Sequence, residues 1–174
     1  MMKITNTVNI NNKSLFWIFA LLSFFLSPEV FAQNAPAQKV PEFTFYKMNG
    51  QAFVRKDISK TKKAVIIFFD VTCDHCQKEL KSMSDHFAEF KKAEFYMVSM
   101  DNVSGIELFM KRYAPNMNGK PNVTLLTDIN RQFIERFLPV QYPALYIYGT
   151  DGRLIRYFGQ NSKISEIIKT VNQL

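Results

Sequence analysis

The sequence predicts an α/β protein with a central mixed β-sheet, helices on both faces of that sheet and a β-hairpin at the start of the domain. Stretches with strand-like patterns alternate with stretches of helical spacing along residues 40–174. The run 64–69 is hydrophobic at every position, which is typical of a strand buried on both faces. A short turn, 149–152, joins the last two predicted strands, so these must be antiparallel and the sheet must be mixed.

Residues 1–32 are predicted to be a secretory signal peptide. A polar stretch with two lysines precedes an almost unbroken apolar run, 15–26, and the small or β-branched residues Val30 and Ala32 mark the cleavage site. The run is shorter than the about 20 residues that a membrane-spanning helix needs. We expect export to the periplasm or cell envelope with cleavage after Ala32. An uncleaved N-terminal anchor is the alternative, and only in that form is a membrane contact expected.

The mature chain opens with a tail, a hairpin, the buried strand and a helix. Residues 33–39 are polar with alanine and proline, which indicates a flexible tail, and residues 40–174 are predicted to form one domain. Within 41–54 apolar residues alternate with polar ones around Asn49-Gly50, the strongest short turn signal for a hairpin. Apolar residues recur every three or four positions over 76–92, so we expect a helix there.

The second half of the domain continues the alternation. The predicted strands are 94–100, 122–126, 143–148 and 153–158, and the predicted helices are 103–113, 129–137 and 163–171. Asp128 and Ser162 precede the last two helices and are of the residue types that cap helix N-termini. The predicted order is therefore β-β-β-α-β-α-β-α-β-β-α, without an internal repeat.

Composition excludes several classes of protein. Of the 174 residues, 47% are hydrophobic and 21% are charged, which excludes disorder along the whole chain. The 22 basic and 15 acidic residues give a net charge of +7, but the basic residues are spread along the chain, so no nucleic-acid partner is expected. Two cysteines are too few for a disulfide-stapled miniprotein or a four-thiolate zinc site.

Both cysteines lie in one motif, Cys73-Asp74-His75-Cys76, where the buried strand passes into the first helix. The first turn of a helix carries unpaired backbone N–H groups and the positive end of the helix dipole, and both favour a thiolate over a thiol. We expect Cys73 to be exposed and Cys76, one turn further in, to be more buried and within disulfide reach. A protonated His75 would stabilise a thiolate and hence the reduced pair, whereas Asp74 would oppose this effect.

Other uses of the motif have less support. A zinc site needs a second pair of ligands, and the only histidines are His75 and His86. A c-type haem needs a histidine directly after the second cysteine, where Gln77 stands, so we expect no metal and no cofactor. A structural disulfide would close too short a loop to stabilise much. A peroxiredoxin-like peroxidase is a further alternative, although those enzymes carry threonine three residues before the reactive cysteine, where this chain has Asp70.

Four sequence features point to one family. They are the opening stretch 41–45 with Asn49-Gly50, the strand and CxxC unit at 65–76, an extra strand-helix stretch after Glu94, and Tyr142-Pro143 ahead of an apolar strand. With these features the domain resembles the TlpA/ResA-like exported thiol-disulfide oxidoreductases of the thioredoxin superfamily (redoxin, AhpC/TSA-like). The resemblance covers nearly all of the mature chain. It implies a thioredoxin fold with an N-terminal β-hairpin and an inserted strand-helix unit.

The resemblance also implies roles for single residues. Cys73 matches the attacking cysteine, and Cys76 matches the cysteine that resolves the mixed disulfide. Pro143 matches the family's cis-proline, whose loop offers backbone groups to an incoming chain. Tyr142, directly before it, departs from the family pattern; we expect it to shape which partner binds, and a core aromatic is the alternative. Glu79 matches a glutamate thought to assist proton transfer in this group, and a solvent-facing helix glutamate is the alternative.

Two departures from the family pattern concern the direction of electron flow. Thr72 stands where the group usually has tryptophan, and His75 is shared with the strongly oxidising DsbA type. Asp74, Glu79 and the architecture favour a reductant. The resemblance thus implies an exported enzyme that reduces or exchanges disulfides of envelope proteins, with a membrane or periplasmic reductant as a second partner. A non-enzymatic partner module, with the CxxC pair as a staple, is the remaining alternative.

Overall fold

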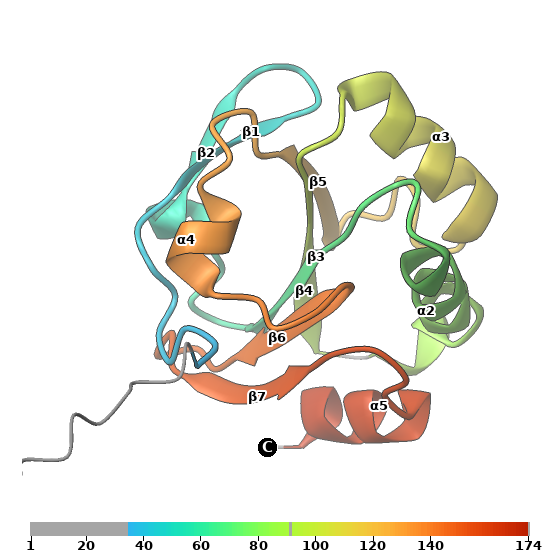
Figure 1. Ribbon diagram of the computed structural model, residues 1–174. Coiled ribbons are helices and arrows are strands. Elements are labelled where there is room, and N and C mark those ends of the chain that lie inside the picture. Colours follow the sequence, from blue (N-terminus) through green and yellow to red (C-terminus); the bar gives the residue numbers. More distant parts are fainter. Residues whose placement is uncertain (1–34, 91, 174) are drawn as a thin grey trace, which may run out of the picture. The chain divides into compact units, whose positions relative to one another are not determined.

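Strand β3 (Lys63–Phe68) runs through the interior of a seven-stranded mixed sheet in the computed structural model of the chain (Figure 1). The structure describes residues 35–90 and 92–173. The predicted signal peptide, residues 1–32, therefore lies outside the described residues. None of the described helices is long and apolar enough to cross a membrane.

The remaining elements follow the predicted order. The other strands are β1 (Thr44–Lys47), β2 (Ala52–Val54), β4 (Ala93–Ser99), β5 (Val123–Thr127), β6 (Ala144–Tyr148) and β7 (Leu154–Phe158). The helices are α2 (Asp74–Asp85), α3 (Val103–Tyr113), α4 (Phe133–Phe137) and α5 (Ile164–Asn172), with short 3₁₀ turns η1 (Arg55–Asp57) and η2 (Phe87–Glu89). In the sheet the strands are ordered β2-β1-β5-β4-β3-β6-β7. Strands β3, β4 and β5 are parallel, and the other neighbouring pairs are antiparallel, which confirms the predicted mixed sheet.

Helices cover both faces of the sheet, as predicted. Helices α2, α3 and α5 pack on one face and α4 packs on the other (Figure 1). Along β3, Val65 and Ile67 belong to the first apolar cluster, whereas Ile66 and Phe68 belong to the second. The strand is hydrophobic at successive positions because both of its faces lie in the core.

An aromatic stack fixes α4 on its face of the sheet. The ring of Phe133 lies 4.2 Å from that of Phe68 and 4.2 Å from that of Phe137, measured between centroids. Both helix rings also meet the ring of Tyr146 edge-on. A helix this short is not stable by itself, so its position depends on this packing.

The first helix is shorter than predicted. It ends at Asp85 rather than at residue 92, and a 3₁₀ turn carries the chain onward. Phe90, which the helical spacing assigned to the apolar face, is nevertheless buried and meets Phe95 edge-on at 5.3 Å. The helical spacing of apolar residues continues beyond α2 because the 3₁₀ turn η2 that follows packs against the same apolar cluster.

Two predicted helix starts are also wrong. The carboxylate of Asp128 accepts hydrogen bonds from the backbone N–H groups of Gln132 and Phe133, so α4 begins at Phe133 instead of residue 129. The hydroxyl of Ser162 donates to the carbonyl of Gly159 and does not cap α5. Asp128 thus holds the first N–H groups of α4 from four and five residues upstream, whereas Ser162 binds the preceding loop.

Phe133→Ala should lower the free energy of unfolding by about 3–5 kcal/mol, because it empties the centre of the aromatic stack. The neighbouring Ile134 is 42% exposed, so Ile134→Ala is the matched control and should cost about 0.5 kcal/mol. Urea denaturation of both variants measures the difference. Equal losses would show that the stack does not hold α4 in place.

Candidate active site

The chain turns sharply between the end of β3 and the start of α2. The backbone N–H and the hydroxyl of Thr72 both donate to Oδ1 of Asp70, at 2.7 and 2.6 Å. The N–H of Cys73 donates to the carbonyl of Asp70 at 3.2 Å. An aspartate that binds the backbone two residues onward is a common turn former, and here the turn delivers Cys73 to the start of the helix.

Cys73 is the N-cap residue of α2. Its Sγ accepts the backbone N–H of Cys76 at 3.4 Å, so the sulfur lies at the end of the helix where N–H groups are unpaired. Cys73 is half-buried, whereas Cys76 is fully buried, and both are free thiols. The expected placement at the helix start and the expected difference in burial are both found. A reagent arriving from solvent therefore meets Cys73 first.

The surroundings of Cys76 disfavour its ionisation. Burial raises the pKa of the Cys76 thiol, and the neighbouring Cys73 and the carboxylate of Asp70 raise it further. A hydrogen bond from the backbone of Asp70 opposes these effects. These surroundings favour the protonated thiol at Cys76.

The three predicted tuning residues occupy different surroundings on α2. Asp74 and His75 are exposed in its first turn. Glu79 is half-buried one helical turn after Cys76, on the same side of the helix. Burial raises the pKa of Glu79 to about 7. This partial burial argues against the alternative that Glu79 is an ordinary solvent-facing residue.

The predicted substrate-binding loop lies beside Cys73. The Tyr142-Pro143 peptide bond is cis, as the family resemblance implied. The ring of Tyr142 packs 5.4 Å from that of Phe68, and Tyr142 and Cys73 line one hollow. Burial, and then the charge on Asp70, raise the pKa of the Tyr142 hydroxyl.

Two residues of the last hairpin hold this loop in place. The hydroxyl oxygen of Tyr157 accepts the backbone N–H groups of Val140 and Gln141, at 3.1 and 3.3 Å. The side chain of Gln141 lies directly on Gly159, where an added Cβ would come within 1.8 Å of the amide nitrogen. A larger residue at 159 would have to displace the exposed Gln141 side chain from this loop.

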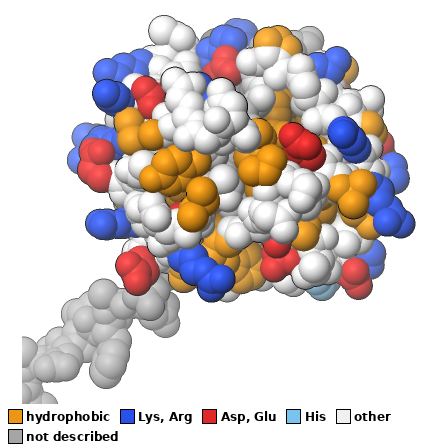
Figure 2. All heavy atoms as spheres, turned by 90° about the horizontal axis from the view of Figure 1, so that it is seen from above, with side chains coloured by type: hydrophobic (Ala, Val, Ile, Leu, Met, Phe, Trp, Pro, Cys, Tyr) orange, Lys and Arg blue, Asp and Glu red, His pale blue; other side chains and the backbone are white. Residues whose placement is uncertain are grey.

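The hollow beside Cys73 has a volume of about 410 Å³. Its walls include Cys73 and Tyr142, and the charged residues Asp70, Asp101 and Arg131. Figure 2 views the end of the molecule at which β3 finishes, and shows hydrophobic side chains exposed across that face with acidic and basic side chains between and around them. Such a surface offers apolar contact and charge next to the reactive sulfur.

The polar side chains of Ser99 and Asp101, which support the loop ahead of Cys73, were not identified from the sequence. Oδ2 of Asp101 accepts the backbone N–H of Val71 at 3.0 Å and the hydroxyl of Ser99 at 2.7 Å, so Asp101 ties the end of β4 to the loop ahead of Cys73. An available signal was that each parallel strand leads into an aspartate, namely Asp70, Asp101 and Asp128. Parallel strands end at one edge of a sheet, so these residues had to lie near one another.

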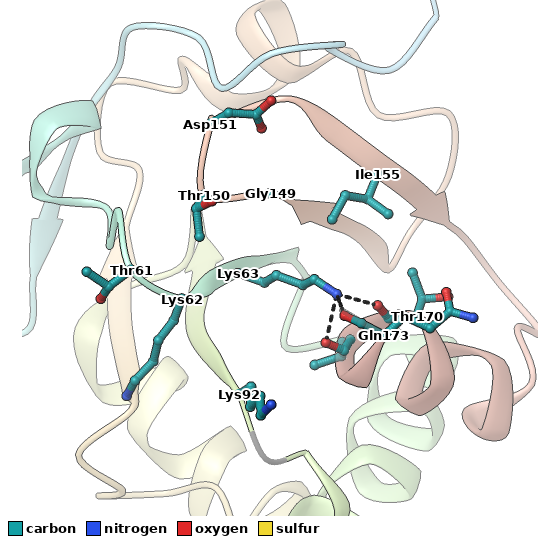
Figure 3. Close-up of a pocket in the computed structure, with 11 residues that line it drawn as sticks. Thr61, Lys62, Lys63, Lys92, Gly149, Thr150, Asp151, Ile155, Thr170 and Gln173 are labelled. Carbon is teal, nitrogen blue, oxygen red and sulfur yellow. Dashed lines mark hydrogen bonds between the residues drawn. The ribbon is translucent and has the colours of Figure 1, made fainter.

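A second hollow, of about 610 Å³, lies where β3 begins, at the other end of the strand from Cys73. There Nζ of Lys63 donates to the backbone carbonyls of Thr170, Val171 and Gln173 at the end of α5 (Figure 3). Burial, and then the charge on Lys92, lower the pKa of Lys63. Lysine here satisfies the last carbonyls of the helix, which is a structural role.

The sequence of residues 36–157 matches the AhpC/TSA family. The match covers more than half of the chain. The chain belongs to the AhpC/TSA family. A search of curated proteins finds no match.

Solved structures similar to this AhpC/TSA member share its fold. A secreted disulfide oxidoreductase from Mycobacterium tuberculosis, homologous to E. coli DsbE, is 23% identical, with a TM-score of 0.61 over 76% of this chain and 96% of that one. A peroxiredoxin-like protein from Aquifex aeolicus is 18% identical, with a TM-score of 0.60 over 78% and 85%. A thioredoxin-like protein from Aeropyrum pernix is 9% identical, with a TM-score of 0.63 over 94% and 99%. The predicted thioredoxin fold is confirmed, and the fold is shared with both oxidoreductases and a peroxiredoxin-like protein.

The described part of the chain contains no group of three or more histidine, cysteine, aspartate or glutamate side chains placed to hold a metal ion. The reactive groups within the site are two thiols and the carboxylates around them. Together with the fold, they support a redox enzyme of the thiol-disulfide oxidoreductase class.

Glu79→Gln should change how stability depends on pH. A folded pKa of about 7 lies above the ordinary 4.5, so the folded protein retains a proton that the unfolded chain releases, and stability falls as pH rises from about 4.5 to 7. Glutamine cannot ionise, so the variant should melt at a higher temperature than wild type at pH 8 and at a similar temperature at pH 4. Glu107→Gln, at an exposed position of α3, should show no such difference. Parallel melting curves for Glu79→Gln and wild type at both pH values would contradict the raised pKa.

Proposed function

We propose that the protein is an exported thiol-disulfide oxidoreductase that reduces or exchanges disulfides of cell-envelope proteins through Cys73 and Cys76. The observation that carries the proposal is the N-cap position of Cys73, with an accessible sulfur bound by the N–H of the buried Cys76. The similar secreted oxidoreductase from M. tuberculosis supports both the chemistry and the export. Residues 1–32 would supply the export signal.

The proposed cycle uses the two thiols in turn. The Cys73 thiolate attacks one sulfur of a substrate disulfide, forms a mixed disulfide and releases the other substrate sulfur as a thiolate. Cys76 then loses its proton and attacks the sulfur of Cys73. This step releases the second substrate thiolate and leaves a Cys73–Cys76 disulfide. Glu79, half-buried with a pKa of about 7, is the proposed acceptor of the Cys76 proton.

The charges around the pair favour a reductant. Asp70 and Asp74 lie within three residues of Cys73, and the carboxylate of Asp70 raises the pKa of Cys76. Negative charge disfavours thiolates, so it stabilises the disulfide relative to the reduced pair and makes the dithiol a stronger reductant. His75 acts in the opposite direction when protonated. All three side chains are exposed and screened by solvent, so the two carboxylates oppose one imidazole under similar conditions.

The proposed partners meet the face around Cys73. Tyr142 and the loop at Pro143 would hold an extended substrate segment by backbone hydrogen bonds and apolar contact. Oxidised Cys73–Cys76 must be reduced again, so a membrane or periplasmic reductant is the second proposed partner. Both partners are expected to use the same face, because Cys76 is buried and is reached only through Cys73.

Peroxide reduction is the rival function, because a peroxiredoxin-like protein shares the fold. Asp70 argues against it, since its carboxylate brings negative charge close to the site where a peroxide oxygen would develop negative charge. An assay of peroxide consumption without a disulfide substrate separates the two functions. Turnover of peroxide by Cys73 at a rate exceeding disulfide exchange would favour the rival.

Cys73→Ser should abolish disulfide exchange, whereas Cys76→Ser should trap mixed disulfides with substrate proteins, because attack still occurs but release does not. Non-reducing gels of envelope extracts and an insulin reduction assay measure the two effects. Ser165→Ala, at an exposed position of α5 away from the thiol pair, is the control for handling and folding. Identical behaviour of the two cysteine variants would refute the assigned order of attack.

A further inference from the structure

The hollow beside Cys73 carries charges of both signs around an apolar base. Phe68 and Phe69 lie buried at its base, and Met100 and Tyr142 form partly exposed walls. Its volume of about 410 Å³ lies near the lower end of the range for small-molecule sites. A space of this size, open to the reactive sulfur, suits a small ligand.

Arg131 supplies the positive charge from an exposed side chain on a sharply turned backbone. Its φ of 54° is in the left-handed region, which residues other than glycine rarely adopt. Its N–H donates to the carbonyl of Asp128, a fully buried residue. Among the described residues, the Arg131 guanidinium takes part in no ion pair. It therefore remains available to an anion inside the hollow.

The negative charges keep one free oxygen each. Oδ1 of Asp70 accepts both hydrogen bonds from Thr72, and Oδ2 of Asp101 accepts those from Val71 and Ser99. No described residue donates to Oδ2 of Asp70 or to Oδ1 of Asp101. These hydrogen bonds hold the carboxylates in position and leave an acceptor that a cation can use.

We propose that this hollow binds a small zwitterionic disulfide of the cystine class, with its carboxylate on Arg131, its ammonium on Asp70 and its sulfur atoms at Cys73. This inference rests on the proposed function and names a substrate for the same thiol pair. The carboxylate and ammonium of cystine branch from one carbon, next to a CH₂–S group, so opposite charges on two walls with an apolar base between them match the ligand. Glutathione disulfide carries an ammonium and a carboxylate on one carbon as well, but at a greater separation from its sulfurs and with an additional carboxylate in each half.

The reaction balances with the reduced protein as the electron donor. The Cys73 thiolate attacks one cystine sulfur, the S–S bond breaks, and one cysteine leaves as a thiolate that takes a proton. Cys76 gives up its proton and attacks the Cys73 sulfur, which releases the second cysteine. One cystine is thus reduced to two cysteines, and the two protein thiols are oxidised to one disulfide.

Four small disulfides test the inference by their charges. Cystine carries both charges, cystamine only ammonium groups, 3,3′-dithiodipropionate only carboxylates, and 2-hydroxyethyl disulfide none. The rate of thiol loss from the reduced full-length chain is measured with each by acid quench and alkylation. Each rate is divided by that of the same disulfide with free N-acetylcysteine, which removes its intrinsic reactivity. Glutathione disulfide, as a fifth probe, distinguishes a cystine-sized ligand from a larger one.

Arg131→Gln should lower the normalised reaction rates with cystine and dithiodipropionate by about tenfold, which is the effect of one lost charge-assisted hydrogen bond. The rates with cystamine and 2-hydroxyethyl disulfide should not change. Asp70→Asn should lower the reaction rates with cystine and cystamine relative to the rate with 2-hydroxyethyl disulfide. Dividing by the rate with 2-hydroxyethyl disulfide removes any effect of the substitution on the thiols themselves. Arg136→Gln, at an exposed position of the following helix α4, is the control and should change nothing.

Three results separate the possible failures. Equal slowing of all four disulfides by Arg131→Gln would overturn the subsite, because Arg131 would then act on the protein and not on ligand charge. A normalised cystine rate no higher than that of 2-hydroxyethyl disulfide would overturn it as well. No reaction with any disulfide would refute the proposed function itself. If Arg131→Gln lowers the rate with glutathione disulfide but not the rate with cystine, the subsite is supported and is assigned to the larger ligand.

Discussion

Strand β3 is buried on both of its faces, and this constraint sets the positions of the elements around it. Helices α2, α3 and α5 must cover one face and α4 the other, since each face presents only apolar side chains. The chain can leave this core only at the strand ends. At the carboxyl end it turns at Asp70 and enters α2, so the burial of the strand places Cys73 at the surface and at a helix N-terminus together.

The same geometry gives the two thiols different accessibility to solvent. Cys73 stands outside the first turn of α2, whereas Cys76 faces the core with Leu80 and Met83. The half-buried Glu79 lies one turn further along the same side. Accessibility thus selects Cys73 for attack on an incoming disulfide, and burial holds Cys76 back until a sulfur atom is bonded to Cys73. Asp101 and Tyr157 stiffen the loops on either side, so the reacting groups keep their relative positions.

The parts of this structure that local patterns encode could be predicted from the sequence. The apolar run of β3, the Asn49-Gly50 turn and the CxxC pair each identify an element or site by neighbouring residues alone. Predicted helix limits were wrong where a side chain bound backbone groups several residues away, as Asp128 does with the start of α4. Asp101 could have been assigned to the site only by recognising that β3 and β4 are parallel and end at one edge of the sheet. Arg131 had no such signal, because it comes from the loop after β5 and carries no motif.

The central claim is that Cys73 and Cys76 form a reversible redox pair that acts as a reductant. Equilibration of the full-length chain with mixtures of reduced and oxidised glutathione, followed by alkylation and mass analysis, measures the reduction potential of the pair directly. The account predicts a reversible two-electron couple with a potential nearer to that of thioredoxin, about −270 mV, than to that of DsbA, about −120 mV. A potential near −120 mV would contradict a reductant, and a pair that does not exchange with glutathione at all would contradict the enzyme.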